Sequence, residues 1–136
     1  MSKSPIILAV DTKDLDTARS WIEATNGSVN TYKFGLEFYL KFGAAGLRKL
    51  SEAGDFEIFL DLKLHDIPNT VKKSIEGLKV LPINMLTIHT SGGLQMMRAA
   101  MKAVNGTDIK VFGVTALTSL TDDDTNIIYQ RDAASQ

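Results

Sequence analysis

The chain has 136 residues, of which 44% are hydrophobic, 23% are charged and ten are glycine. This composition is typical of a globular domain and excludes a disordered or fibrous chain. The 15 Lys and Arg residues nearly balance the 16 Asp and Glu residues, so the net charge is −1 at pH 7. No overall basic field exists to bind nucleic acid or an anionic membrane, and we expect a few placed side chains to hold any anionic ligand.

The sequence contains no cysteine, which excludes disulfides, thiolate metal sites and a cysteine nucleophile. Its two histidines, His65 and His89, are too few and too far apart for a zinc motif. The apolar stretch at residues 5–10 is shorter than the ~7–15 residues of a signal-peptide core. No later segment approaches the ~18 apolar residues of a membrane span. We therefore expect a cytoplasmic protein with no metal site and neither nucleic acid nor a membrane as partner.

Short apolar runs alternate with longer amphipathic stretches along the chain. In chain order, the apolar runs predict buried strands at residues 5–10, 31–35, 57–62, 85–89 and 109–115. The stretches between them predict helices at residues 14–25, 36–53, 67–80 and 92–104, and the polar segment 122–136 is expected to begin a further helix.

Capping and breaking residues mark the helix ends. Asp11 or Thr12 is expected to cap the first helix, and the Asn-Gly pair at 26–27 to stop it. Gly43 is expected to interrupt the second helix. Pro68 fits the first turn of the third helix, where its missing N–H costs nothing.

The predicted strands begin at intervals of 24 to 28 residues, and a helix separates each strand from the next. This alternation predicts βαβ units and a parallel sheet, either an open doubly wound sheet or a (β/α)8 barrel. Eight units at this interval need about 208 residues, within the usual range of such barrels. A barrel chain of this length is thus truncated to about five βα units. No linker divides the chain, and we expect one partial domain over residues 1–136.

Every predicted strand carries a polar residue toward its carboxyl end or just after it, with Lys33 lying inside its strand. These residues are Asp11, Lys33, Asp61 and Lys63, His89 and Thr90, and Thr115 and Thr118. Ligands bind at the carboxyl ends of the strands in both parallel architectures. The pattern therefore favours a binding site at that edge of the sheet.

The densest polar segment covers residues 61–70, DLKLHDIPNT. Because side chains alternate along a strand, Asp61 and Lys63 are expected on one face, where Lys33 of the neighbouring strand can join them. A carboxylate between two lysines stays ionised and can form a rigid array. A buried ion-pair cluster without function is the other interpretation, and Asp66 also suits a helix N-cap. The combination of these four residues favours a functional site.

Five segments resemble the orotidine 5′-phosphate decarboxylase family in order and spacing across nearly the whole chain. They are residues 8–11 (LAVD), 33–35 (KFG), 61–70 (DLKLHDIPNT), 88–93 (IHTSGG) and 114–119 (VTALTS). The resemblance implies a homodimeric (β/α)8 barrel that decarboxylates orotidine 5′-phosphate to UMP in de novo pyrimidine biosynthesis. It also implies that no metal or organic cofactor takes part.

The resemblance further implies roles for individual residues. Asp11 and Lys33 would bind ribose hydroxyls, and Lys33 would also fix Asp61. Asp61 would lie against the substrate carboxylate, and Lys63 would protonate C6 of the pyrimidine. The remaining assignments are Thr118 against the pyrimidine ring and, reaching into the partner subunit's site, Asp66, Ile67 and Thr70.

The arginine that grips the substrate phosphate in this family lies in loops after later strands. None of the chain's arginines matches it by position; these are Arg19, Arg48, Arg98 and Arg131. We therefore expect this chain alone to bind substrate weakly and to turn over little or not at all. Unpaired edge strands also predict association, as a dimer or a larger species.

Two alternatives remain open. Magnesium-dependent barrels that act on sugar phosphates resemble this chain in the Asp-x-Lys-x-x-Asp block, but carry Glu where Lys33 stands. Lys33 and residues 67–70 argue against them. The second alternative is a non-catalytic associating half-barrel, which the missing phosphate loops favour and the charged array does not.

Overall fold

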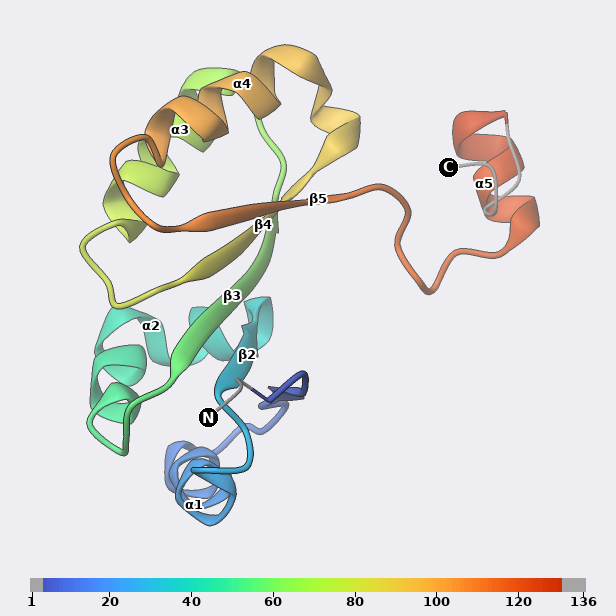
Figure 1. Cartoon of the computed structure of the whole chain (residues 1–136). Helices are drawn as coiled ribbons and strands as arrows, with labels where there is room; N and C mark the ends of the chain where they lie inside the picture. The colour runs from blue at the N-terminus through green and yellow to red at the C-terminus, as the bar shows by residue number, and fades with distance from the viewer. Residues whose placement is uncertain (1–3, 131–136) are drawn as a thin grey trace.

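The structure, a computed structural model, describes residues 4–130. Its strands form one five-stranded sheet whose spatial order follows the chain, and every neighbouring pair is parallel. The strands are β1 (Ile7–Ala9), β2 (Thr31–Gly35), β3 (Glu57–Leu64), β4 (Met85–His89) and β5 (Lys110–Val114). The predicted α/β fold of five parallel βα units is therefore confirmed (Figure 1).

A helix follows each strand. The helices are α1 (Leu15–Thr25), α2 (Leu36–Ser51), α3 (Pro68–Leu78), α4 (Gly93–Ala103) and α5 (Asp122–Tyr129), with a short 3₁₀ turn, η1 (Thr90–Gly92), before α4. Figure 1 shows α5 standing apart from the sheet at the end of an extended segment. The end of the last predicted helix, 131–136, lies outside the described residues. Among residues 4–130, no helix is both long and apolar enough to cross a bilayer.

Within residues 4–130, helices α1 to α4 cover one face of the sheet and leave the other uncovered (Figure 1). Side chains on that face are almost fully buried, as the exposed fractions of Tyr32 (0%), Leu60 (0%) and Leu86 (1%) illustrate. On the other face, Ile7 of β1 and Phe112 of β5 are 47% and 46% exposed. The sheet thus resembles a barrel wall whose inner surface is open to solvent.

The caps predicted for α1 are wrong, and so is the alternative interpretation of Asp66 as an N-cap. The N-cap of α1 is Asp14 rather than Asp11 or Thr12, and its carboxylate accepts a 2.7 Å hydrogen bond from the Thr17 N–H. The N-cap of α3 is Ile67 rather than Asp66. A residue before proline favours extended backbone, and Ile67, with φ −60° and ψ 152°, precedes Pro68. Helical geometry therefore begins one residue later than an Asp66 cap requires.

The third strand is irregular where the polar segment begins. Leu60 pairs with Leu86 and Leu64 with Ile88, so residues 61–63 stand opposite Thr87 alone. This bulge accompanies a left-handed backbone at Lys63, whose φ is 48°. The strand continues two residues beyond the predicted end at Leu62. The bulge, rather than regular alternation, therefore sets where the Lys63 side chain lies.

Candidate active site

A carboxylate between two lysines lies at the carboxyl ends of β2 and β3. Lys33 Nζ lies 3.2 Å from Asp61 Oδ2, and Lys63 Nζ lies 2.9 Å from both carboxylate oxygens of Asp61. The Asp61 side chain is 12% exposed, whereas the two lysines reach further into solvent. The structure thus brings together the three residues that form the centre of the predicted site.

Thr87 is a fourth member of this cluster that the sequence analysis missed. Its hydroxyl donates a 2.8 Å hydrogen bond to Asp61 Oδ1 and accepts one of 2.8 Å from the backbone N–H of Lys63. A signal was available, because Thr87 is a hydroxyl residue in the middle of the apolar run at residues 85–89. On a strand it shares a face with His89, which marks the carboxyl end of β4.

Hydrogen bonding keeps Asp61 ionised. Burial by itself raises the pKa of Asp61, but hydrogen bonds from Lys63, Thr87 and Lys33 outweigh it and hold that pKa below the ordinary value of 3.8. At neutral pH the cluster is therefore one carboxylate between two ammonium groups. Its geometry is set before any ligand arrives.

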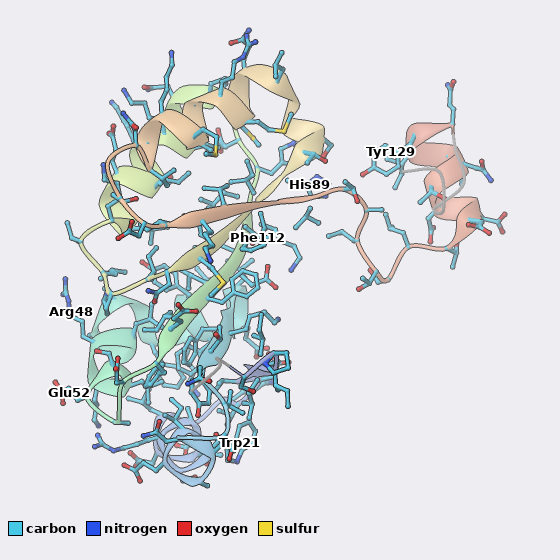
Figure 2. The ribbon with its side chains drawn as sticks, viewed as in Figure 1. Trp21, Arg48, Glu52, His89, Phe112 and Tyr129 are labelled. Atoms are coloured by element: carbon cyan, nitrogen blue, oxygen red, sulfur yellow. The ribbon has the colours of Figure 1, made fainter. Side chains whose placement is uncertain are left out.

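The two histidines meet beside this cluster. Their rings stack with centroids 5.2 Å apart and an interplanar angle of 18°. Nδ1 of His89 accepts a 3.3 Å hydrogen bond from the Ser91 N–H, so in the neutral ring the proton lies on Nε2. Burial, then His65 and Lys63, lower the pKa of His89 from 6.5. His89 is thus a buried, neutral ring at the start of η1 (Figure 2).

Two adjoining cavities surround the charged cluster. The larger, about 610 Å³, is lined by the four clustered residues and by the segment after β5: Lys33, Asp61, Lys63, Thr87, Val114, Ala116, Leu117, Thr118 and Ser119. The second, about 480 Å³, shares the three charged residues and adds Asp11 and both histidines. Among the predicted site residues, Asp11 and Thr118 therefore lie at the same mouth as the cluster.

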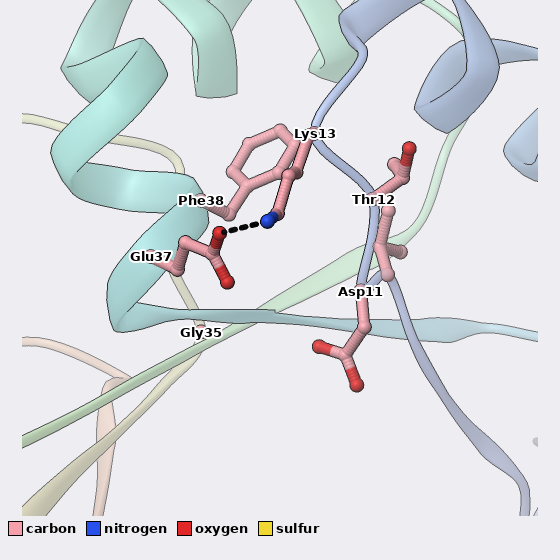
Figure 3. A pocket seen from close by; sticks show the side chains of 7 residues that line it. Asp11, Thr12, Lys13, Gly35, Glu37 and Phe38 are labelled. Carbon is pink, nitrogen blue, oxygen red and sulfur yellow. Dashed lines mark ion pairs between the residues drawn. The ribbon is translucent and has the colours of Figure 1, made fainter.

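A smaller hollow of about 120 Å³ lies between the ends of β1 and β2 (Figure 3). Lys13 and Glu37 form an exposed ion pair of 3.4 Å along its wall. Figure 3 shows the Asp11 carboxylate directed away from that pair. Asp11 thus lines both this hollow and the 480 Å³ cavity.

Three predicted residues lie outside the two main cavities. Asp66, Ile67 and Thr70 are exposed around the start of α3, and none of them lines either cavity. Figure 2 places Arg48 on α2, away from His89. Among residues 4–130, no three His, Asp or Glu side chains are grouped so that they could hold a metal ion.

Known proteins resemble this chain over nearly its whole length. It is 45% identical over 134 residues to orotidine 5′-phosphate decarboxylase of Wolbachia pipientis subsp. Culex pipiens (strain wPip), covering 98% of this chain and 59% of that protein. It is 49% identical to the protein of the same name from Ehrlichia canis (strain Jake), covering 89% of this chain and 53% of that protein. The chain therefore spans little more than half the length of these curated relatives.

Solved structures agree in fold. An uncharacterized conserved protein from Geobacillus kaustophilus superposes with a TM-score of 0.84 at 31% identity, covering 96% of this chain and 64% of that one. Orotidine 5′-phosphate decarboxylase from Lactobacillus acidophilus gives a TM-score of 0.77 at 34% identity, covering 94% and 59%. A family model matches residues 4–135, and the chain belongs to the orotidine 5′-phosphate decarboxylase / HUMPS family.

Proposed function

We propose that residues 1–136 form one partial barrel domain of a cytoplasmic enzyme that decarboxylates orotidine 5′-phosphate to UMP. The observation that carries the proposal is the Lys33–Asp61–Lys63 cluster on the open face of the sheet. The adjoining 610 Å³ cavity adds Thr118, which is expected to contact the pyrimidine ring. The names of the two curated relatives support the same reaction.

The proposed reaction uses only side chains and no cofactor. The bond between C6 and the carboxylate carbon breaks, carbon dioxide leaves, and the electron pair remains on C6. The Lys63 ammonium then transfers a proton from Nζ to C6 and becomes a neutral amine. Its positive charge stabilises the carbanion that exists only late in the reaction, which is transition-state rather than ground-state binding.

Asp61 and its neighbours are proposed to position the substrate. With its pKa held low, Asp61 would present a negative charge to the substrate carboxylate, a repulsion that ends when carbon dioxide leaves. Lys33 would fix Asp61 and, with Asp11, bind ribose hydroxyls. Both residues line the 480 Å³ cavity, which supports this assignment.

We further propose a homodimer with shared active sites. Asp66, Ile67 and Thr70 are exposed and line neither main cavity of their own chain. In the dimer they would reach into the partner subunit's site. This placement supports a role between subunits rather than within one.

The chain alone is proposed to bind substrate weakly. It spans little more than half of its curated relatives, and Figure 2 shows Arg48 away from His89. Phosphate binding remote from the reacting carbon supplies much of the energy for such catalysis. Activity of the 136-residue chain is therefore expected to rise when the C-terminal part of a relative is supplied in trans. No activity with or without that part would favour the associating half-barrel.

A magnesium-dependent sugar-phosphate lyase is the second candidate, because the family name also includes HUMPS. The lyases of that group carry Glu at the position of Lys33, as the resemblance described above implies. Here Lys33 Nζ ion-pairs with Asp61, so a cation already occupies this side of the carboxylate. Magnesium-dependent binding of a pentulose phosphate, measured by calorimetry, would support the lyase instead.

The decisive variant is Lys63→Ala, assayed with the C-terminal part supplied. We expect the rate of decarboxylation to fall by roughly 10²–10⁴-fold, the usual contribution of a positioned proton donor. Binding of UMP should change little, since the proton donor acts in the transition state. Lys102→Ala, an exposed lysine on α4, is the control and should leave both quantities unchanged. Equal losses of binding and rate in Lys63→Ala would contradict the proton-donor role.

A further inference from the structure

The backbone at Lys63 has an unfavourable conformation. Its φ of 48° is in the left-handed region, which residues other than glycine rarely adopt. The regular pairing of β3 with β4 is interrupted here, because residues 61–63 stand opposite Thr87 alone. Such a conformation persists only where its surroundings hold it.

The side chain of Thr87 supplies a hydrogen-bond partner for the Lys63 backbone where the strand pairing is interrupted. Thr87 is only 4% exposed. Its hydroxyl accepts a hydrogen bond from the Lys63 N–H and donates one to Asp61 Oδ1, and both hydrogen bonds are 2.8 Å long. The directions are unambiguous, because an N–H can only donate and an ionised carboxylate can only accept. A single hydroxyl therefore joins the backbone of Lys63 to the carboxylate of Asp61.

We propose that Thr87 is a positioning residue. Its hydroxyl holds the bulged backbone of Lys63, which directs Lys63 Nζ, and it orients the Asp61 carboxylate to which Lys63 Nζ is hydrogen-bonded. The contribution to catalysis rests on the proposed function, whereas the structural part does not. Thr87 acts through Asp61 and Lys63 and takes no part in the proton transfer.

The chemistry of residue 87 separates this role from simple packing. Valine has nearly the shape of threonine but has a methyl group in place of the hydroxyl. In Thr87→Val the Lys63 N–H and one Asp61 oxygen would therefore face an apolar group, which is unfavourable for buried polar atoms. Thr87→Ser keeps the hydroxyl and loses only a methyl group.

A matched control exists on β2. Thr31 is also buried on a strand, and its hydroxyl also donates to a carboxylate, Glu57 Oε2, at 3.4 Å. It lies at the amino end of β2, two residues before Lys33, and it pairs with Glu57, whereas Asp61 pairs with Gly35 at the carboxyl end. Thr31→Val therefore removes a buried hydroxyl whose hydrogen bond goes to Glu57 and not to Asp61 or the Lys63 backbone.

The structural test measures the Lys63 amide and the Asp61 carboxyl by NMR. Thr87→Val should speed hydrogen exchange at the Lys63 amide by about tenfold or more and raise the pKa of Asp61, because one hydrogen bond is lost at each group. Thr87→Ser and Thr31→Val should leave both readouts close to wild type. Unchanged readouts in Thr87→Val, or equal changes in Thr31→Val, would overturn the proposal.

The kinetic test uses orotidine 5′-phosphate with the C-terminal part supplied. Thr87→Val should lower kcat by about tenfold with little change in KM, and Thr87→Ser should restore it. A change in KM alone would overturn the catalytic part. If the wild type does not decarboxylate the substrate at all, the proposed function fails, while the two NMR readouts still decide whether Thr87 positions Lys63.

A second comparison of variants is needed if circular dichroism shows that Thr87→Val does not fold. Thr87→Cys and Thr87→Ser have similar size, but a thiol is a much weaker hydrogen-bonding group than a hydroxyl. The cysteine variant should then show the faster Lys63 exchange and the serine variant should not. Equal exchange in the two variants would overturn the proposal.

Discussion

His89 is a neutral ring beside ammonium groups. It is 8% exposed, stacks on His65 and lies in the same cavity wall as Lys33 and Lys63. Asp11, Glu37 and Asp61 also line that cavity. Burial first, then His65 and Lys63, lower the pKa of His89 from 6.5. Protonating His89 is therefore less favourable in the folded protein than in the unfolded chain.

This resistance predicts a loss of stability in mild acid. As the pH falls below 6.5, the unfolded chain takes up a proton at His89 while the folded chain does not, so the free energy of unfolding decreases until the lowered folded pKa is reached. His89→Asn should flatten the dependence of urea-unfolding free energy on pH between about pH 5 and 7. His65→Asn, at the exposed ring of the pair, should retain most of it. An unchanged slope in His89→Asn would contradict the assignment.

At this scale the sequence predicted the charged residues better than the neutral ones. Period-two alternation and parallel pairing were enough to bring Lys33 and Asp61 to one edge. Thr87 stood out as a hydroxyl residue in an apolar run, but its importance depends on the bulge opposite it, which no local pattern in residues 61–63 indicates. The Asp66 cap failed because Pro68 sets the backbone of the residue before it.

The second helix bends at a glycine. Gly43 has φ 57° and ψ −158°, a conformation nearly closed to other residues, and it divides α2 into two helical pieces. Three residues later, a Cβ at Gly46 would lie 2.4 Å from the Cβ of Phe42, an atom that cannot move without its backbone. The bend thus relies on two glycines. The sequence indicated the interruption at Gly43 but not the close approach at Gly46.

Two glycine-to-alanine variants should therefore have opposite effects. Gly43→Ala forces a Cβ into a left-handed position and should destabilise the protein by about 1–3 kcal/mol. Gly77 in α3 has ordinary helical backbone and open space around it, so Gly77→Ala should be neutral or stabilise by up to ~1 kcal/mol. Urea unfolding of both variants measures the difference. A Gly43→Ala protein as stable as Gly77→Ala would contradict the inferred strain.

The positions of all five strands and both ends of β2 and β4 were predictable for a physical reason, whereas the bounds of β1 and β5 and the end of β3 were not. Side chains on the helix-covered face of β2, β3 and β4 are buried, so apolar runs marked these strands in the sequence. The end of β3 was placed two residues early, at Leu62, because pairing continues beyond the bulge to Leu64. Strand β1 is shorter than its apolar run, since only Ile7–Ala9 pairs with β2.

Over residues 4–130 the molecule presents one open face and two edge strands. In this part of the chain, β1 pairs only with β2, and β5 pairs only with β4. Phe112 on β5 is nearly half exposed, with its ring 5.6 Å from that of Phe59 on the same open face. Edge strands and exposed aromatic rings favour association with another polypeptide.

We therefore expect the isolated 136-residue chain to form dimers or larger species as its concentration rises. Phe112→Lys should weaken this association by placing a charge on the open face. Met101→Lys changes an exposed side chain on α4, away from that face, and should not. Sedimentation velocity over a range of concentrations measures the effect. A monomer at every concentration would contradict the expectation.

The open surface that carries Phe112 also carries Asp61 and its two lysines. Any polypeptide that packs there displaces solvent, and in the resulting lower dielectric the attraction between these charges grows. The strength of the ion pairs in the cluster therefore depends on association. Water screens the charges while this face is exposed, and a polypeptide bound there excludes that water.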